Sequence, residues 1–371
     1  MSKQSEVIII GGGIAGVSAG AQLSQYCDVT ILEKESTTGY HATGRSAAVF
    51  APAYGNEVVR NLTSASEAFY RSPPAGFTEV PLLKPRDGVF IASHAQQQPL
   101  ANMLNKSSHL SELSAEELVQ RVPIIDSAQV YGGALDCTGG DLDVDAIVQG
   151  FLRQFRSNGG VLICDSEVQH IEWRNGLWHF TTPSAEYCAP TIINAAGAWA
   201  DEVAMMAGIS PLSMKPFRRS ALLIDAPLKI DITDWPLVID VDENFYFKPE
   251  AGQLLISPAD ETPFGPCDAY PDEMDLAIAI DRVQKISQLE VSKINHSWAG
   301  LRTFASDKTF VVGYEPGQEG FFWLAGQGGY GVQSAPALAD ITCHLICGSN
   351  NIITQLHREK HLLDISPERF R

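Results

Sequence analysis

The sequence predicts a mixed α/β fold of two domains, one with a parallel sheet and one that is mainly antiparallel β. The length of 371 residues corresponds to two or three domains at roughly 150 residues each. Residues 6–10 are β-branched and lead directly into glycines, which is typical of a parallel strand buried on both faces. An antiparallel sheet is indicated by four short apolar runs broken by proline or glycine, at residues 220–224, 236–239, 244–248 and 253–257.

Composition and charge exclude several classes of protein. Apolar residues make up 45% and charged residues 19% of the chain, near the globular averages of about 45–50% and 25%, so wholesale disorder is not expected. No apolar run approaches the roughly 20 residues of a membrane-spanning helix. The 26 Lys and Arg against 44 Asp and Glu give a formal charge of −18, which disfavours nucleic acid and anionic membranes as partners. Any bound anion must therefore be held by local groups.

The seven cysteines are scattered, and no two form a C-x-x-C pair. Neither a disulfide framework nor a zinc site is expected, and no metal is predicted. Cys343 and Cys347 lie four residues apart in an apolar helical pattern and are interpreted as core cysteines. The apolar stretch at residues 7–10 is shorter than the roughly 7–15 residues of a secretory signal core. The sequence therefore predicts a reduced, cytoplasmic protein.

The first strand leads into a nucleotide-binding motif. Gly11, Gly13 and Gly16 match G-x-G-x-x-G, whose glycines permit a tight turn, close approach of a pyrophosphate, and close packing of the next helix. The start of that helix can bind the pyrophosphate without a lysine or arginine, because it carries unpaired N–H groups and about half a positive charge. Glu33 ends a second strand 22 residues after Gly11, near the roughly 20 expected of an acid that binds an adenosine ribose. These residues predict a Rossmann-like domain that binds NAD or FAD.

Further segments resemble the D-amino acid oxidase family of FAD-dependent oxidoreductases. Residues 39–48 read GYHATGRSAA, and such small residues suit close approach to a flat ligand. Four more segments follow in the family's order: DCTGGDLD at 136–143, IINAAGAW at 192–199, WAGLR at 298–302 and GGYGVQ at 328–333. Within this family the chain is most similar to the bacterial D-arginine dehydrogenase type. The resemblance spans almost the whole chain and implies non-covalently bound FAD.

The positions of these segments imply that both domains are discontinuous. The FAD-binding domain is expected to contain residues 1–53, 132–207 and 297–371. The substrate-binding domain is expected to contain residues 54–131 and 208–296, and to cover the flavin with a mainly antiparallel sheet.

The resemblance also implies which residues bind FAD. Glu33 and Lys34 would contact the ADP half, and Val168 would meet the adenine through its backbone. The helix that starts near Gly331 would stabilise negative charge on the reduced flavin. The complete predicted set consists of Gly11, Gly13, Ile14, Ala15, Gly16, Glu33, Lys34, Ala42, Thr43, Gly44, Arg45, Ser46, Ala47, Ala48, Val49, Val168, Gly197, Gly328, Gly329, Tyr330, Gly331, Val332 and Gln333.

Four residues are predicted to act on the substrate. Arg302 matches the family's carboxylate-binding arginine, whose planar fork suits both oxygens, and Tyr246 matches a phenol on the same carboxylate. Tyr54 follows the flavin loop, where the family places a phenol near substrate or water. Strand alternation turns only one of Arg218 and Arg219 inward, and the resemblance favours Arg219. No general base is nominated, because hydride transfer to flavin needs no protein nucleophile and positioning contributes most.

Two departures from the D-arginine dehydrogenase type leave the preferred side chain open. Gly88 stands where that type has a glutamate for a cationic side chain, and Val49 stands where it has a histidine. Asp87 is a candidate replacement for the missing acid. Loss of a charge-assisted contact worth roughly 1.5–3 kcal/mol favours neutral or apolar side chains, whereas the net negative charge of the protein favours neutral or cationic substrates.

The predicted reaction is FAD-dependent oxidation of a D-amino acid with a basic or apolar side chain. Hydride transfer to flavin N5 gives the imino acid, and water hydrolyses it to the 2-oxo acid. One alternative is oxidation of a secondary amine, such as an N-methyl amino acid or an opine. Another is a non-catalytic FAD-binding subunit of a complex. The expected electron acceptor is oxygen or a quinone of an electron-transfer chain, through which the protein could associate with a membrane.

Overall fold

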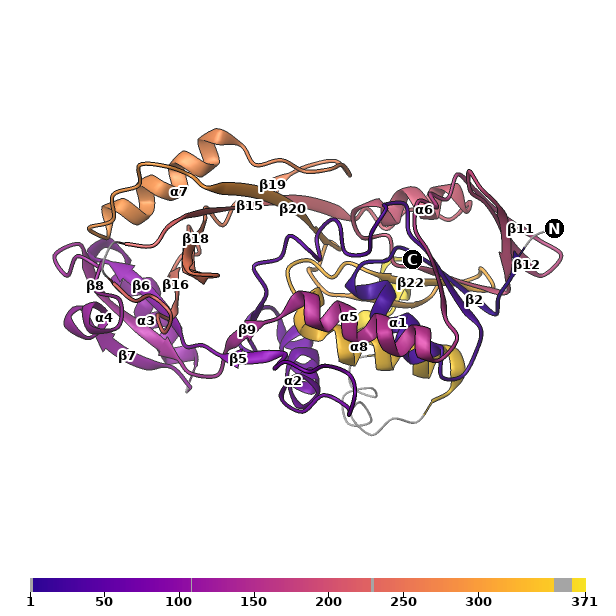
Figure 1. Ribbon diagram of the computed structural model, residues 1–371, viewed down its shortest axis with the longest axis horizontal. Helices are drawn as coiled ribbons and strands as arrows, with labels where there is room; N and C mark the ends of the chain where they lie inside the picture. Colours follow the sequence, from indigo (N-terminus) through magenta and orange to yellow (C-terminus); the bar gives the residue numbers. More distant parts are fainter. Residues whose placement is uncertain (1–2, 108, 228–229, 350–361) are drawn as a thin grey trace.

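The computed structural model describes residues 3–107, 109–227, 230–349 and 362–371. The molecule is elongated, and its two domains lie side by side along the long axis (Figure 1). No helix within these ranges is long and apolar enough to cross a membrane.

The first domain is built on a six-stranded sheet. Its strand order is β10 (Val161–Ile163), β3 (Val29–Leu32), β2 (Val7–Ile10), β14 (Thr191–Asn194), β22 (Phe321–Ala325) and β21 (Val311–Tyr314). All neighbours are parallel except β21, which is antiparallel to β22. This order places the ends of β3, β2 and β14 at one edge of the sheet, where ligands of open parallel sheets bind.

Two different layers cover this sheet (Figure 1). One face packs against the helices α1 (Ile14–Leu23), α5 (Val144–Ser157) and α8 (Gly331–Cys347). The other face packs against α6 (Ala200–Met206), which follows a 3₁₀ turn at Gly197–Trp199, and against a small sheet. The strands of this small sheet are β1 (Lys3–Gln4), β13 (Glu186–Ala189), β12 (Leu177–Thr181) and β11 (His170–Arg174).

Alternation along β2 explains the two layers. Val7 and Ile9 point into the helical core, whereas Ile8 and Ile10 point into the core beneath α6 and the small sheet. All four are buried, as expected of a parallel strand with both faces covered. The predicted Rossmann-like domain is confirmed.

The second domain is built on a nine-stranded sheet. Its order is β19 (Thr262–Pro263), β15 (Lys215–Asp225), β18 (Gln253–Ser257), β17 (Tyr246–Glu250), β16 (Leu237–Asp240), β6 (Gly88–Ser93), β8 (Val130–Asp136) and β7 (Ser111–Ser114), with β20 (His296–Phe304) paired to β15. Its strand pairs are antiparallel except β16 with β6. The predicted second, mainly antiparallel domain is confirmed.

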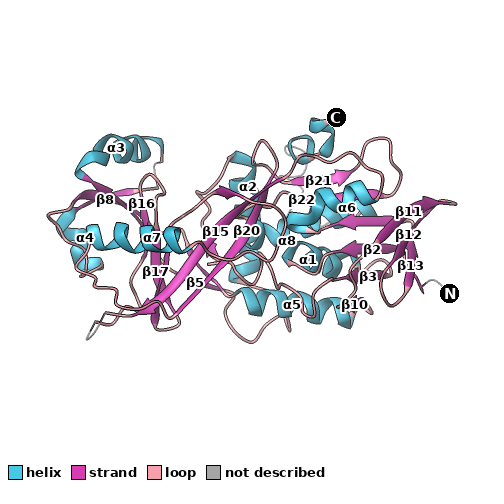
Figure 2. Cartoon of the chain, turned by 90° about the horizontal axis from the view of Figure 1, so that it is seen from above, coloured by secondary structure: helices cyan, strands magenta, loops and turns pink. Residues whose placement is uncertain are grey.

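Helices cover parts of both faces of the large sheet. On one face, α7 (Glu273–Lys285) and α4 (Ala115–Arg121) pack over an apolar core. On the other face, α3 (Gln97–Lys106), preceded by a 3₁₀ turn at His94–Gln96, packs near β6 and β8. The long strands β15 and β20 run side by side toward the first domain (Figure 2).

A three-stranded sheet lies between the domains (Figure 1). Its strands are β4 (Val49–Phe50), β9 (Gly140–Leu142) and β5 (Leu83–Pro85). On β9, Asp141 forms ion pairs with Arg86 and with the buried Lys248 of the large sheet, whose Nζ lies 2.9 Å from Asp141 Oδ1. This ion-pair cluster links the second domain to the three-stranded sheet.

Three elements pack with a different domain from the one in which the sequence analysis placed them. The helix α2 (Glu57–Arg71), expected in the substrate-binding domain, buries its apolar face with α8, and the Tyr70 hydroxyl donates to the Val332 carbonyl. Conversely, β8 and β20, expected mostly in the FAD-binding domain, are strands of the nine-stranded sheet. We therefore propose shifting the boundaries near residues 54, 132 and 297 so that α2 joins the first domain and both strands join the second.

The C-terminal segment returns to the first domain. After residues 362–366, the 3₁₀ turn Pro367–Phe370 packs near β21. Arg371 Nε donates to Glu315 Oε1 over 2.7 Å, and Arg369 Nε donates to Asp307 Oδ2 over 2.7 Å. These ion pairs fasten the end of the chain to the six-stranded sheet.

Candidate active site

Three adjoining pockets form a cavity that begins at the carboxyl edge of the parallel sheet. The nucleotide pocket, the central pocket and the distal pocket have volumes of about 1080, 950 and 850 Å³. The first two share lining residues such as Gly13 and Thr43, and the last two share Arg219, Tyr246 and Arg302. A long ligand can therefore extend from the parallel sheet to the underside of the nine-stranded sheet.

Glycine backbone forms the inner wall of the nucleotide pocket. Gly11 has a φ of +109°, and a Cβ there would overlap the Ala195 carbonyl. A Cβ on Gly16 would overlap the Gly11 carbonyl, so this glycine permits close packing of α1 on the turn. Gly13 is the N-cap residue of α1 and, being a glycine, offers no side chain to the free N–H groups of the first turn. Ile14 N donates to Thr43 Oγ1 over 3.0 Å. The positive end of the α1 dipole therefore faces the cavity.

Glu33 braces the glycine turn from the end of β3. Its carboxylate is buried, accepting from Gly12 N at 2.6 Å through Oε2 and from Glu35 N at 2.8 Å through Oε1. Each oxygen has a second lone pair, so the carboxylate can still accept hydrogen bonds from a ribose. Glu33 thus orders the pocket in addition to its predicted contact.

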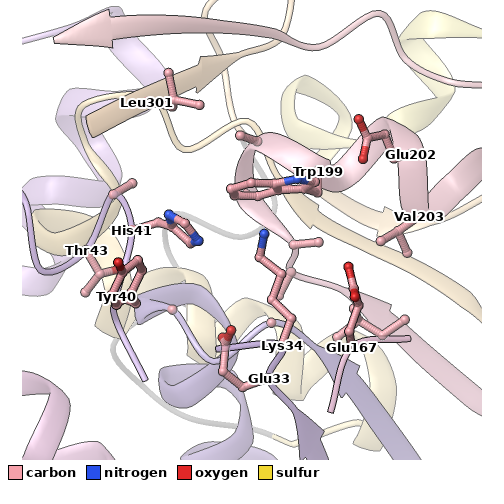
Figure 3. A pocket seen from close by; sticks show the side chains of 18 of the residues that line it. Glu33, Lys34, Tyr40, His41, Thr43, Glu167, Trp199, Glu202, Val203 and Leu301 are labelled. Carbon is pink, nitrogen blue, oxygen red and sulfur yellow. The ribbon is translucent and has the colours of Figure 1, made fainter. Parts of the chain in front are cut away.

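Aromatic and charged side chains form the outer wall of the nucleotide pocket (Figure 3). The Lys34 Nζ lies 3.3 Å from the centre of the Trp199 ring, and the His41 ring lies 4.7 Å from the same ring. His41 Nε2 is 2.8 Å from Glu35 Oε1. Trp199 and His41 were not predicted as site residues. Both lie inside the motif segments at residues 39–48 and 192–199, and their aromatic rings could have marked them as candidates for contact with a ligand.

Arg45 is held by the protein rather than left free for a phosphate. Its Nη1 donates to the carbonyls of Ala269 and Ala299 over 3.0 and 3.1 Å, and its Nη2 donates to Asp268 Oδ1 over 2.5 Å. The Trp298 indole N–H donates in turn to the Arg45 carbonyl over 2.9 Å. Arg45 therefore ties the loop at residues 42–48 to the second domain while lining the cavity.

Two buried amide donors, one in the loop before α8 and one in its first turn, have no partner among the described residues. Gln333 Oε1 accepts from Ala51 N over 3.0 Å, which fixes the orientation of the amide. Within the described ranges, Gln333 Nε2 and Gln327 Nε2 are buried and make no hydrogen bond. Gln333 lines the distal pocket and Gln327 the central pocket. Buried donors of this kind fit a ligand with carbonyl or ring-nitrogen acceptors, as a flavin has.

Most of the predicted FAD-binding residues line the cavity. Those that do are Gly11, Gly13, Ile14, Ala15, Glu33, Lys34, Ala42, Thr43, Arg45, Ser46, Ala47, Ala48, Val49, Val168, Gly197, Gly328, Gly329, Gly331, Val332 and Gln333.

Three predicted residues line none of the three pockets. Gly16 lies behind the turn and packs on Gly11. Gly44 N donates to the Gly39 carbonyl over 2.7 Å within a tight turn. The Tyr330 side chain is buried, with its ring centre 5.9 Å from that of Phe304. Gly16 and Gly44 shape the backbone around the cavity, and Tyr330 packs in the core.

The strand register brings the predicted substrate residues together. Arg219 on β15 is opposite Gly300 on β20, and Arg302 is opposite Phe217. Because directly opposed residues share a face, Arg219 and Arg302 are diagonal neighbours on the cavity side of the sheet. Arg218 points to the other face, where its Nη2 donates to Asp275 Oδ2 over 2.7 Å.

The two arginines differ in their partners. Arg219 Nε donates to the Asp260 carbonyl over 2.8 Å, and Nη2 lies 3.3 Å from Glu261 Oε1. Burial, together with the charge of Arg302, lowers the pKa of Arg219 from its usual range. Arg302 makes no hydrogen bond or ion pair within the described part of the chain, and a Cβ on Gly329 would come within 2.9 Å of its Nη1. The cavity therefore offers an unneutralised guanidinium beside a glycine backbone.

Two phenols lie in the distal pocket. Tyr54 packs its ring 5.3 Å from that of Tyr330. Burial raises the pKa of Tyr54, although the charge of Arg302 opposes the shift. Tyr246 lies in the same cross-strand row as Ile239 and Phe90. Both phenols can donate to a carboxylate held by Arg302.

The far wall of the distal pocket contains residues that the sequence did not point to. These are Phe90, Leu237, Ile239, Glu243 and Phe245. Neither Gly88 nor the predicted candidate Asp87 lines the pocket, and Asp87 Oδ2 lies 3.7 Å from Arg121 Nη1. No motif marks these residues, since they come from strands and a turn brought together by the sheet.

Within the described ranges, no three His, Cys, Asp or Glu side chains gather in a way that could hold a metal ion.

A Rossmann-like domain whose ligand cavity continues beneath an antiparallel sheet is the arrangement of a protein that binds a dinucleotide. A family profile for FAD dependent oxidoreductases (DAO) matches residues 6–345. The chain therefore belongs to the DAO family of FAD-dependent oxidoreductases, and FAD is its cofactor.

Individual relatives are distant. FAD-dependent oxidoreductase domain-containing protein 1 of Bos taurus is 23% identical over 93% of this chain and 81% of its own length. Human mitochondrial dimethylglycine dehydrogenase is 24% identical over 69% of this chain and 30% of its own length. The resemblance to the D-arginine dehydrogenase type stays a prediction.

Solved structures share the fold of this chain. Dithionite-reduced L-alpha-glycerophosphate oxidase from Mycoplasma pneumoniae, with FAD bound, superposes with a TM-score of 0.82 at 18% identity, over 93% of this chain and 95% of that chain. Glycine oxidase from Geobacillus kaustophilus superposes with a TM-score of 0.78 at 20% identity, over 95% and 96% of the two chains.

Proposed function

We propose that the protein oxidises a D-amino acid at its carbon–nitrogen bond, giving an imino acid that water hydrolyses to the 2-oxo acid. The observation that carries this proposal is the guanidinium of Arg302, which has no partner among the described residues and lies at the junction of the central and distal pockets. Two phenols, Tyr54 and Tyr246, line the distal pocket with it. A planar cation with two neighbouring donors suits a carboxylate.

The cavity fits FAD along its whole length. The nucleotide pocket would hold the adenosine, the start of α1 the pyrophosphate, and residues 326–333 the flavin. As far as the chain is described, the lining of the central pocket contains neither cysteine nor histidine, which supports the proposal that FAD is held without a covalent bond. Bound FAD supplies the acceptor for the hydride removed from the substrate.

The residues of the chain act mainly by positioning. Arg302 would hold both carboxylate oxygens and so fix the α-carbon in the cavity, which is worth several kcal/mol when reacting groups are correctly oriented. Tyr54 stays protonated at neutral pH because burial raises its pKa, so it donates a hydrogen bond and does not act as a base. The apolar side chains of Phe90 and Ile239 would lie against the apolar part of the bound substrate.

Oxidation of a secondary amine is the second candidate. The relative named dimethylglycine dehydrogenase supports this alternative, and the same carboxylate site would serve it. A non-catalytic FAD-binding subunit is disfavoured by the unpaired Arg302, which has no partner within the described residues.

The proposed location is the cytoplasm, with oxygen or a quinone as electron acceptor. The structure records no disulfide among the described residues, which supports a reducing compartment. Rapid reoxidation of the reduced flavin by oxygen would identify an oxidase, whereas reoxidation by a quinone alone would identify a dehydrogenase.

The proposal is tested by anaerobic reduction of the flavin in the purified holoprotein. D-amino acids, their L-enantiomers and N-alkylated amino acids are compared as reductants. We expect D-amino acids to bleach the flavin fastest. Bleaching by N-alkylated compounds alone would favour the secondary-amine reaction, and a flavin that no amine bleaches would contradict an amine-oxidising function.

A further inference from the structure

The distal pocket contains one acidic residue among the described residues that line it, Glu243. Glu243 stands in the turn between β16 and β17, directly before Asn244. Neither Asp87 nor Gly88, the positions considered from the sequence, reaches this pocket.

The charges in the cavity are separated. Arg219, Arg302 and Tyr246 line both the central and the distal pocket, so they stand where the two meet. Glu243 lines the distal pocket only. The other residues of that far wall are apolar: Phe90, Leu237, Ile239 and Phe245. A ligand whose carboxylate binds Arg302 would therefore extend along an apolar wall toward a carboxylate.

The backbone at Glu243 is held in an unfavourable conformation. Its φ is +57°, in the left-handed region that non-glycine residues rarely adopt. Glu243 N donates to the Asp240 carbonyl over 2.8 Å, and Asp240 Oδ2 accepts from Asp242 N and Asn244 N, each over 3.1 Å. Asp240 is itself buried. A strained residue kept in place by a braced turn at the edge of a ligand cavity is a functional candidate.

Glu243 is an exposed residue on the lining of the distal pocket, so a ligand can reach its carboxylate. It makes no hydrogen bond or ion pair within the part of the chain that the structure describes. Its negative charge is one of the causes that raise the pKa of Tyr54 and of Tyr330. The carboxylate is thus within electrostatic reach of the phenol that lines the same pocket.

We propose that Glu243 determines side-chain specificity by binding an ammonium or guanidinium group at the end of the substrate's alkyl side chain. This inference rests on the proposed function, because it assumes that Arg302 holds the α-carboxylate. The alkyl part would lie along Phe90 and Ile239. The preferred substrates are then basic amino acids. The carboxylate that binds their side chain would come from Glu243, in the turn between β16 and β17, and not from Asp87.

The test compares D-lysine with D-norleucine, which has the same carbon chain without the terminal ammonium. The holoprotein is reduced anaerobically with each, and kcat/KM and the dissociation constants are measured. We expect wild type to prefer D-lysine by about tenfold or more, and Glu243→Gln to lose about tenfold or more of that preference, as expected for a charge-assisted contact. The loss should appear in KM more than in kcat, with D-norleucine changed less than about twofold.

Two further variants separate loss of the Glu243 carboxylate from misfolding and from a general change of charge. Glu243→Gly removes the carboxylate and relieves the backbone strain, so it should fold and lose the same preference. Asp87→Asn changes an acid outside the pocket and should leave the preference intact. Equal use of both amino acids by wild type, or an unchanged ratio in Glu243→Gln, would overturn the role of Glu243.

Failure of the proposed function gives a different result. If neither amino acid reduces the bound flavin, the proposed function fails, and the dissociation constants of the two ligands still test Glu243. In that case, equal affinities in wild type and Glu243→Gln would overturn its role as well. If only the L-enantiomers react, the same ratio is measured with L-lysine and L-norleucine.

Discussion

The two ends of the cavity offer different groups to a ligand. The nucleotide pocket relies on backbone, with Gly11 and Gly13 at the turn, the dipole of α1, and Glu33 bracing the turn through Gly12 N. The distal pocket relies on side chains, since Arg302, Tyr246 and Glu243 stand on strands or turns of the nine-stranded sheet.

This difference implies that FAD binding and flavin reduction can be impaired separately. Substitutions at the glycine turn should disturb FAD binding, whereas substitutions in the distal pocket should leave FAD bound and impair its reduction. On the proposed function, a protein with a formal charge of −18 would hold two anionic groups, because a helix dipole and an arginine act over short distances where net charge has little effect.

Gly16→Val should have the largest effect. A side chain there would overlap the Gly11 carbonyl and separate α1 from the turn. We expect purified protein without FAD and with reduced thermal stability, measured by flavin absorbance and a melting curve. Gly265→Ala is the matched control, because its Cβ would meet open space. Normal FAD content in Gly16→Val would refute the role assigned to the close packing of α1.

Arg302→Ala should reduce kcat/KM for flavin reduction by about 100-fold or more, since the substrate carboxylate loses a bidentate, charge-assisted partner. FAD content should stay normal. Arg302→Lys should recover only part of the activity because an ammonium lacks the planar fork. Anaerobic stopped-flow reduction measures both variants, and rates equal to wild type would remove Arg302 from the substrate site.

Glu33→Ala should weaken FAD binding by about tenfold, because Gly12 N and Glu35 N lose their buried acceptor along with any contact to ribose. Glu33→Gln keeps an acceptor oxygen and should bind FAD better than Glu33→Ala. Titration of the apoprotein with FAD gives the affinities. Equal affinities in wild type and Glu33→Ala would contradict the bracing role.

Tyr54→Phe should have the smallest effect, a several-fold loss of kcat/KM from one neutral hydrogen bond. Burial raises the pKa of Tyr54 above its ordinary value of 10.0, since burial disfavours the charged phenolate. The hydroxyl therefore stays protonated between pH 6 and pH 9, and the ratio of wild type to variant should be constant over that range. A ratio that falls as pH rises through 8 or 9 would show that Tyr54 ionises there.

The nucleotide end could be predicted because its signal is local. Gly11, Gly13 and Gly16 lie within six residues, and Glu33 follows at the end of the next strand. The predicted residues Gly11, Gly13 and Glu33 line the nucleotide pocket. Even here the sequence did not show that Glu33 binds Gly12 N or that Arg45 is held by Asp268. Such contacts depend on loops that meet only in the folded protein.

The residues of the distal pocket could be predicted only where a sequence motif or strand pattern pointed to them. Arg302 belongs to the WAGLR segment that resembles the family, and strand alternation separated Arg219 from Arg218. Glu243 had no such signal, because its position depends on the pairing of β16 with β6 and β17. The shift proposed for the boundary near residue 54 has the same origin, since the contact of α2 with α8 joins segments more than 250 residues apart.

The independence of the two ends is tested most directly by measuring FAD affinity and flavin reduction in the same preparations of Glu33→Ala and Arg302→Ala. The expected result is a crossed pattern. Glu33→Ala should weaken FAD binding while the flavin that remains bound is reduced at a nearly normal rate, and Arg302→Ala should bind FAD normally while reduction is lost. Equal changes in both quantities for both variants would contradict the assignment of cofactor binding to the backbone end and substrate binding to the side-chain end.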